Sequence, residues 1–293
     1  AGIQTAKAGG SLAVDANNIN IISADTGIDL NLNAANLVET DVLTAGNDIS
    51  IHATTFTAND TEAGNNIDIT ADSIDAENTV SGNDITLNSN SYINTNTVNA
   101  GHDIIMTAET VNTDKLIAGN DIGIHATDIT ANSTEAGNDI SLVADAIEAK
   151  NTIAGNNINF EADSNIFNQN AVAGNNIEMT AGLNINNDNA VAENNITMSA
   201  GANIANDSAE AGNNISMTAG TNLNSTSAKA KNGNLTFTAT TINSESAIAG
   251  QNIAMNSTDA LNSANANAGA NISFTSATNI NSTNANAGAC VGV

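Results

Sequence analysis

The chain has 293 residues, none of them Pro, Trp or Arg, and its 31 acidic residues against five Lys give a net charge of −26. This composition lacks the clustered basic residues that bind a phosphate backbone or an anionic membrane surface, so we expect no nucleic-acid partner. No apolar run is long enough to cross a bilayer, so we expect no membrane insertion. The single Cys290 excludes an internal disulfide and a cysteine-based zinc site.

A repeat of 18 to 20 residues organises the chain from one end to the other. Each copy carries the motif Ala-Gly-Asn-Asn/Asp-Ile-x-apolar-x-Ala, and we call its Gly, or the residue that replaces it, the anchor. In chain order the anchors are Gly9, Gly27, Gly46, Gly64, Gly82, Gly101, Gly119, Gly137, Gly155, Gly174, Glu193, Gly212, Asn232, Gly250, Gly269 and Gly288. Because no stretch lacks the repeat, we predict a single repeat domain over residues 1–293 without a linker.

Within each copy the pattern favours strands over helices. An aliphatic residue lies three positions after the anchor, a larger apolar residue five after it, and Ala or Ser seven after it, with mostly polar residues between them. This period-two alternation is typical of a strand with one buried face. A second apolar column follows ten residues after the anchor in 18-residue copies and eleven after it in 19-residue copies. The extra residue therefore enters at a corner, where it does not exchange the two faces of a strand.

Burial then predicts how the copies associate. One coil cannot bury its own apolar face, whereas matching columns from neighbouring coils can bury one another. We therefore predict an all-β fold, a right-handed parallel β-helix (β-solenoid) of about 15 coils with about three short strands in each. Met198 and Met217 are expected to touch as successive rungs of one interior column.

The residue two after the anchor is Asn or Asp in 14 of the first 15 copies. One interpretation is a stacked corner residue, because Asn and Asp bond the local backbone, tolerate left-handed conformations and can bond one another between coils. Four consecutive copies carry Asp in this column, which we call the aspartate ladder: Asp84, Asp103, Asp121 and Asp139. The alternative is that this ladder binds a cation such as calcium through its carboxylate oxygens. Like-charge repulsion is expected to raise the pKa values of the four carboxylates.

Other chemistry has less to support it in the sequence. Outward Ser and Thr pairs such as Thr197 and Ser199 could order water as ice-binding solenoids do, but exposed strands commonly carry such hydroxyls. His52 and His125 share a column but lie four coils apart, which is too far for one metal ion. No nucleophile, base and orienting group can be identified together, so we expect no enzyme, no catalytic residue and no cofactor.

Two copies carry a family resemblance. Ala-Gly-Asn-Asp-Ile-Ser-Ile-His-Ala at 45–53 and Ala-Gly-Asn-Asn-Ile-Ser-Met-Thr-Ala at 211–219 resemble the repeats of filamentous haemagglutinins. These are large bacterial exoproteins of two-partner secretion systems, including contact-dependent inhibition effectors, and their repeats build long right-handed β-helical shafts. The family's secretion domain carries Asn-Pro motifs, and this chain has no Pro, so the resemblance is to the shaft alone.

The resemblance implies the rod of a secreted or surface-displayed bacterial adhesin, located outside the cell, that presents a binding or effector region. A host or cell-surface receptor or a glycan would then be its partner. The alternatives are a cation- or ice-binding solenoid module and a self-assembling extracellular filament subunit. Because neither end of the sequence shows a polar cap, neighbouring coils of the same or an identical chain are also expected as partners.

Overall fold

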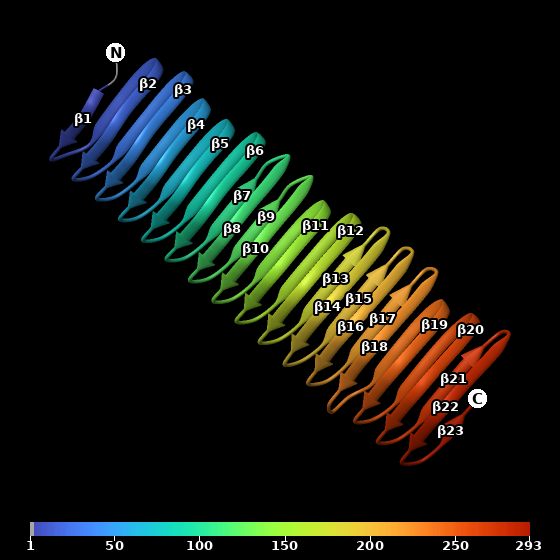
Figure 1. The fold of residues 1–293 in the computed structure, drawn as a ribbon. Coiled ribbons are helices and arrows are strands. Elements are labelled where there is room, and N and C mark those ends of the chain that lie inside the picture. The colour runs from blue at the N-terminus through green and yellow to red at the C-terminus, as the bar shows by residue number, and fades with distance from the viewer. Residues whose placement is uncertain (1–2) are drawn as a thin grey trace. The chain divides into compact units, whose positions relative to one another are not determined.

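The computed structural model describes residues 3–293, which form a parallel β-solenoid of about 15 turns (Figure 1). The all-β, parallel-coil architecture predicted from the repeat is thereby confirmed. The chain divides into two compact units, one ending at Leu142 and the other comprising Val143–Val293. Among the described residues no helix is present that could span a membrane.

The strands follow the repeat, but the prediction of about three short strands in each coil is wrong. A complete coil contains either one strand of 15 or 16 residues, which bends through its corners, or two shorter strands. In the first unit the strands are β1 (Ile3–Ala8), β2 (Leu12–Thr26), β3 (Leu30–Ala45), β4 (Ile49–Ala63), β5 (Ile67–Ser81), β6 (Ile85–Ala100), β7 (Ile104–Thr107), β8 (Thr110–Ala118), β9 (Ile122–His125) and β10 (Asp128–Ala136). In the second unit they are β12 (Ile158–Ala173), β13 (Ile177–Ala181), β14 (Asn184–Ala192), β15 (Ile196–Ala200), β16 (Asn203–Ala211), β17 (Ile215–Ala219), β18 (Asn222–Ala230), β19 (Leu235–Ala249), β20 (Ile253–Ala268), β21 (Ile272–Ser276), β22 (Asn279–Ala287) and β23 (Val291–Gly292). Strand β11 (Ile140–Ala154) contains the boundary between the units.

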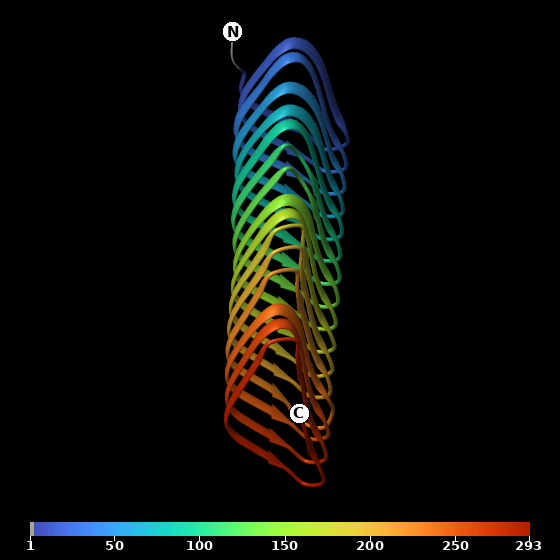
Figure 2. The ribbon, with the colours of Figure 1, turned by 90° about the vertical axis from the view of Figure 1, so that its right-hand side faces the viewer.

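Equivalent residues of successive coils pair in parallel. In the first unit Ile49 of β4 lies opposite Ile67 of β5, and Ile51 lies opposite Ile69. Figure 1 and Figure 2, which show the ribbon from two directions 90° apart, agree that equivalent corners of successive coils within a unit lie one above another. The columns read from the sequence are therefore the columns of the structure.

The length difference between copies is absorbed where the sequence predicted. Between β5 and β6, an 18-residue and a 19-residue coil, the pairing shifts between Ala71 and Ser73. Between β4 and β5, both in 18-residue coils, the pairing has no shift. On either side of this corner the inward columns stay in register, so the extra residue leaves both buried faces intact.

The interior of each unit is filled by apolar columns. In the second unit Met198 pairs with Met217, and Met217 pairs with Phe237; all three side chains are at most 1% exposed. This confirms the predicted contact between successive rungs. Burying a Met or Phe side chain of this kind contributes roughly 1.5–3 kcal/mol, so the stack of columns is the main source of stability.

A buried polar column accompanies the apolar ones in the second unit. Asn168, Asn187 and Asn206 are at most 2% exposed and lie one above another. The amide nitrogen of Asn168 donates to Oδ1 of Asn187 at 2.7 Å, that of Asn187 donates to Oδ1 of Asn206 at 2.8 Å, and that of Asn206 donates to Oγ of Ser225 at 3.0 Å. Each amide also donates to a backbone carbonyl one coil further on. Burial is tolerated because the donors of this ladder are satisfied.

The anchor glycines are required by close approach between coils. No described residue has a positive φ, so the left-handed conformation that Asn and Asp tolerate is not used at this corner. A Cβ on Gly119 would instead overlap the backbone carbonyl oxygen of Gly101 in the preceding coil. Coils pack so tightly at this corner that a side chain on Gly119 would require the backbone to move.

Candidate functional site

The corner after each anchor is joined to the next coil by side-chain hydrogen bonds. Oδ1 of Asp103 accepts hydrogen bonds from the backbone N–H of Asp121 at 3.0 Å and from Nδ2 of Asn120 at 2.8 Å. Asp121 makes the same two contacts with Asp139 and Asn138, at 3.0 and 2.8 Å. The prediction of a stacked corner residue is therefore confirmed, and its role is to satisfy a backbone donor that the strands leave free.

Asparagine performs the same role in the second unit. Oδ1 of Asn176 accepts from the backbone N–H of Asn195 at 3.2 Å and from its Nδ2 at 3.0 Å, and Asn195 repeats both contacts with Asn214. A neutral amide oxygen thus supports the corner as well as a carboxylate does. The negative charges of the aspartate ladder are consequently not needed for the architecture itself.

The aspartate ladder lies in the first unit, each member directly before a strand. Asp84 precedes β6, Asp103 precedes β7, Asp121 precedes β9 and Asp139 precedes β11. Rungs of a parallel sheet are about 4.8 Å apart, so the four carboxylates form one line along the corner. The structure therefore brings together the residues that the sequence singled out.

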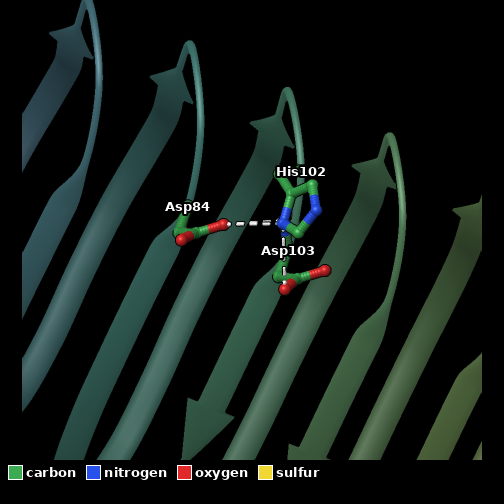
Figure 3. Close-up of side chains that lie close together, drawn as sticks. All are labelled: Asp84, His102 and Asp103. Carbon is green, nitrogen blue, oxygen red and sulfur yellow. Dashed lines mark hydrogen bonds and ion pairs between the residues drawn. The ribbon is translucent and has the colours of Figure 1, made fainter.

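A histidine that sequence reasoning missed completes a tighter group within this line. Nδ1 of His102 lies 3.1 Å from Oδ1 of Asp84 and 3.0 Å from Oδ2 of Asp103 (Figure 3). One potential ligand atom from each residue lies within 4.8 Å of the other two, and among residues 3–293 this is the one such group of His, Cys, Asp and Glu. The sequence did hold a signal: the position after the anchor is Asn in the copies on both sides, at Asn83 and Asn120, and His only here.

The pKa of Asp103 differs from the expectation. Partial burial of the Asp103 carboxylate raises its pKa, but hydrogen bonds from the backbone of Asp121 and the side chain of Asn120, together with His102, outweigh this and lower it. The prediction that repulsion raises the pKa values along the ladder is therefore wrong for Asp103. The donors aimed at the Asp103 carboxylate favour its charged form more strongly than partial burial disfavours it.

The two histidines considered from the sequence lie elsewhere. His52 of β4 pairs with Thr70 of β5, and His125 of β9 pairs with Thr107 of β7. Both side chains are exposed on outward faces. Neither belongs to the group around His102.

Each unit has a surface groove whose lining includes Asn and acidic side chains. In the first unit a groove of about 420 Å³ is lined by residues that include Asn59, Asp75 and Asp114. A groove of about 410 Å³ in the second unit is lined by residues that include Asn224 and Asn262. Their lining residues recur in successive coils, as Asp75, Asn94 and Asn112 do in the first groove.

Acidification should loosen the corner that begins at Asp29. The pKa of Asp29 is lowered, chiefly by the hydrogen bond from Nδ2 of Asn47 at 2.8 Å. A lowered pKa means that the carboxylate stabilises the fold above its ordinary value of about 3.9, and that this contribution is lost as pH falls through the lower folded value. We expect the NMR titration of the Asp29 carboxyl carbon to have its midpoint below about 3.9. A midpoint at or above that value would contradict the prediction, and Asp29→Asn should remove the local acid dependence while keeping an acceptor for Asn47.

No protein-family model, curated protein or solved structure matches the chain. The resemblance of its repeats to those of filamentous haemagglutinins therefore stays a prediction from the sequence.

Proposed function

We propose that the chain is a structural rod segment of a secreted or surface-displayed bacterial adhesin, which holds a binding or effector region away from its attachment point. One observation carries the proposal. In both units the corner side chain of one coil accepts the backbone N–H of the next, as Asp103 does from Asp121 and Asn176 does from Asn195. Successive coils within each unit are thereby joined by side chains as well as by strands, which suits a spacer.

The direction of these bonds supports a mechanical role. Within a unit the hydrogen bonds between parallel strands run from coil to coil, perpendicular to the strands. A pull along such a stack is shared among all the strand ladders and corner bonds of a coil. The acidic surface, with its net charge of −26, disfavours lateral association and keeps such a segment soluble.

The distance that the spacer bridges should depend on its number of coils and not on the outward side chains of those coils. We suggest displaying the chain on a cell between an anchor and a small reporter domain that binds an immobilised target. Deleting residues 193–211, one complete copy, should shorten the spacer by about 4.8 Å and leave the remaining coils folded. Binding of the reporter domain to the immobilised target should change only when several whole copies are removed or added.

The matched control keeps the coil number and changes the surface. Substituting Thr197 and Ser199 by Ala in the same copy should leave reporter binding unchanged. Direct binding of the isolated chain to a glycan array or to host cells, abolished by such surface substitutions, would contradict a spacer and favour a receptor-binding module.

A further inference from the structure

The column that follows the anchor has a defined hydrogen-bonding role. Nδ2 of Asn120 donates to Oδ1 of Asp103 in the preceding coil at 2.8 Å and to Oδ2 of Asp121 in its own coil at 3.1 Å. Asn138 makes the same pair of contacts one coil later, at 2.8 and 3.4 Å. An amide carries two N–H groups, so it can give one hydrogen to each carboxylate.

His102 occupies this column but cannot fill the role. Its Nδ1 faces Oδ1 of Asp84 at 3.1 Å and Oδ2 of Asp103 at 3.0 Å, as the Asn amides face their two carboxylates (Figure 3). A ring nitrogen carries at most one hydrogen, so His102 can donate to only one of the two oxygens, and Oδ1 of Asp84 also accepts the backbone N–H of Asp103 at 3.2 Å. At this coil, therefore, the sequence replaces a side chain that donates to both carboxylates by one that can donate to only one of them.

One metal ion can bind His102 and both carboxylates at once, whereas one proton joins His102 to a single carboxylate. We propose that Asp84, His102 and Asp103 bind one divalent first-row transition-metal ion, with Nδ1 of His102 as its nitrogen ligand and one oxygen from each carboxylate. Two unit negative charges with a neutral imidazole match the charge of such an ion. The side chains of His102 and Asp84 are 54% and 44% exposed, so water has access to complete the coordination.

The distances agree with this assignment. An ion about 2.1 Å from Nδ1 and from each oxygen would have N–metal–O angles of about 95° to Asp84 and about 91° to Asp103, close to the right angle of octahedral and tetragonal sites. The other carboxylate contacts orient the ligands beforehand. Oδ1 of Asp103 is held by Asp121 and Asn120, which leaves Oδ2 toward His102, and Asn83 donates to Oδ2 of Asp84 at 3.2 Å.

The nitrogen ligand determines the class of ion. Calcium and magnesium take oxygen ligands, whereas imidazole suits Zn²⁺, Ni²⁺ and Cu²⁺. The site therefore differs from the calcium ladder considered from the sequence, because it uses two carboxylates of the aspartate ladder and not all four. It also goes beyond the proposed spacer role, and either can fail without the other.

Isothermal titration of the full chain with Zn²⁺, Ni²⁺ and Ca²⁺ tests the proposal. We expect one Zn²⁺ or Ni²⁺ per chain with an affinity above the background of the acidic surface, and Ca²⁺ at background only. His102→Asn is the decisive variant, because it preserves the net charge and installs the residue that the neighbouring coils carry. It should keep the fold and weaken transition-metal binding by at least about tenfold.

Further controls separate the site from diffuse attraction to the acidic surface. His125→Asn removes an exposed histidine outside the group and should leave binding unchanged. Zn²⁺ should shift the imidazole NMR signals of His102 before those of His52 and His125. Unaltered Zn²⁺ and Ni²⁺ binding by a folded His102→Asn variant would overturn the proposal, as would equal loss in His125→Asn or the absence of a saturable event in the unmutated chain.

Discussion

Replacing Met217 by Asp is expected to unfold the coils on either side of it and to cost more than about 4 kcal/mol of unfolding free energy. The Met217 side chain is fully buried in β17, between Met198 of the preceding coil and Phe237 of the following one. A carboxylate at this place would have no cation or donor to pair with. Met198 and Phe237 would also lose the apolar side chain that lies between them.

Hydrogen exchange resolved by residue is the appropriate measurement, because stacked repeats can open locally without unfolding as a whole. Protection should fall in β15, β17 and β19. Two controls isolate the cause. Met217→Leu conserves the volume and should cost less than about 1.5 kcal/mol, and Thr218→Asp places the same charge one residue further on the outward face. If Thr218→Asp were as damaging as Met217→Asp, burial would not be the reason.

Replacing Asn187 by Ala should destabilise the second unit by about 2–4 kcal/mol. The substitution leaves the amide of Asn168 without its acceptor at Oδ1 of Asn187 and leaves Oδ1 of Asn206 without its donor, both in the buried interior. Removing one partner of a buried hydrogen bond costs the desolvation of the other, which exceeds the value of the bond itself.

The same strand provides the matched control. Asn184 of β14 also belongs to a ladder, donating to Asn165 at 2.8 Å and accepting from Asn203 at 2.8 Å, but its surroundings are partly exposed. Water can replace those partners, so Asn184→Ala should cost well under half as much. Urea denaturation of the three proteins compares them directly. Equal losses for the two variants would show that stacking of amides, and not burial, sets the energy.

The fold could be predicted because a solenoid repeats a local pattern. The apolar columns three and five after the anchor have period two, and only in-register stacking buries them, so Ile49 opposite Ile67 follows from the sequence. The corner that takes the extra residue was likewise predictable, since an insertion in a strand would exchange its faces.

What the sequence did not reveal depends on contacts between coils. Asn187 lies two residues after the buried Ile185, so the alternation places it inward, but a polar residue in an inward position is acceptable only when its neighbours form a ladder. The lowered pKa of Asp103 likewise results from donors of the next coil, Asp121 and Asn120, which oppose the repulsion that the sequence suggests. His102 was missed because the aspartate column was read without the column beside it.

The change from Asp to Asn along the corner gives the two units different responses to ionic strength. Carboxylates one rung apart, about 4.8 Å, lie within the Debye length of about 8 Å at physiological salt and therefore repel one another. Dissolved ions screen that repulsion from Asp84 to Asp139, whereas the corner from Asn157 to Asn271 carries no such charges to screen. Dilution into fresh water would consequently weaken the first unit selectively, and seawater would bring the two corners closer to equal stability.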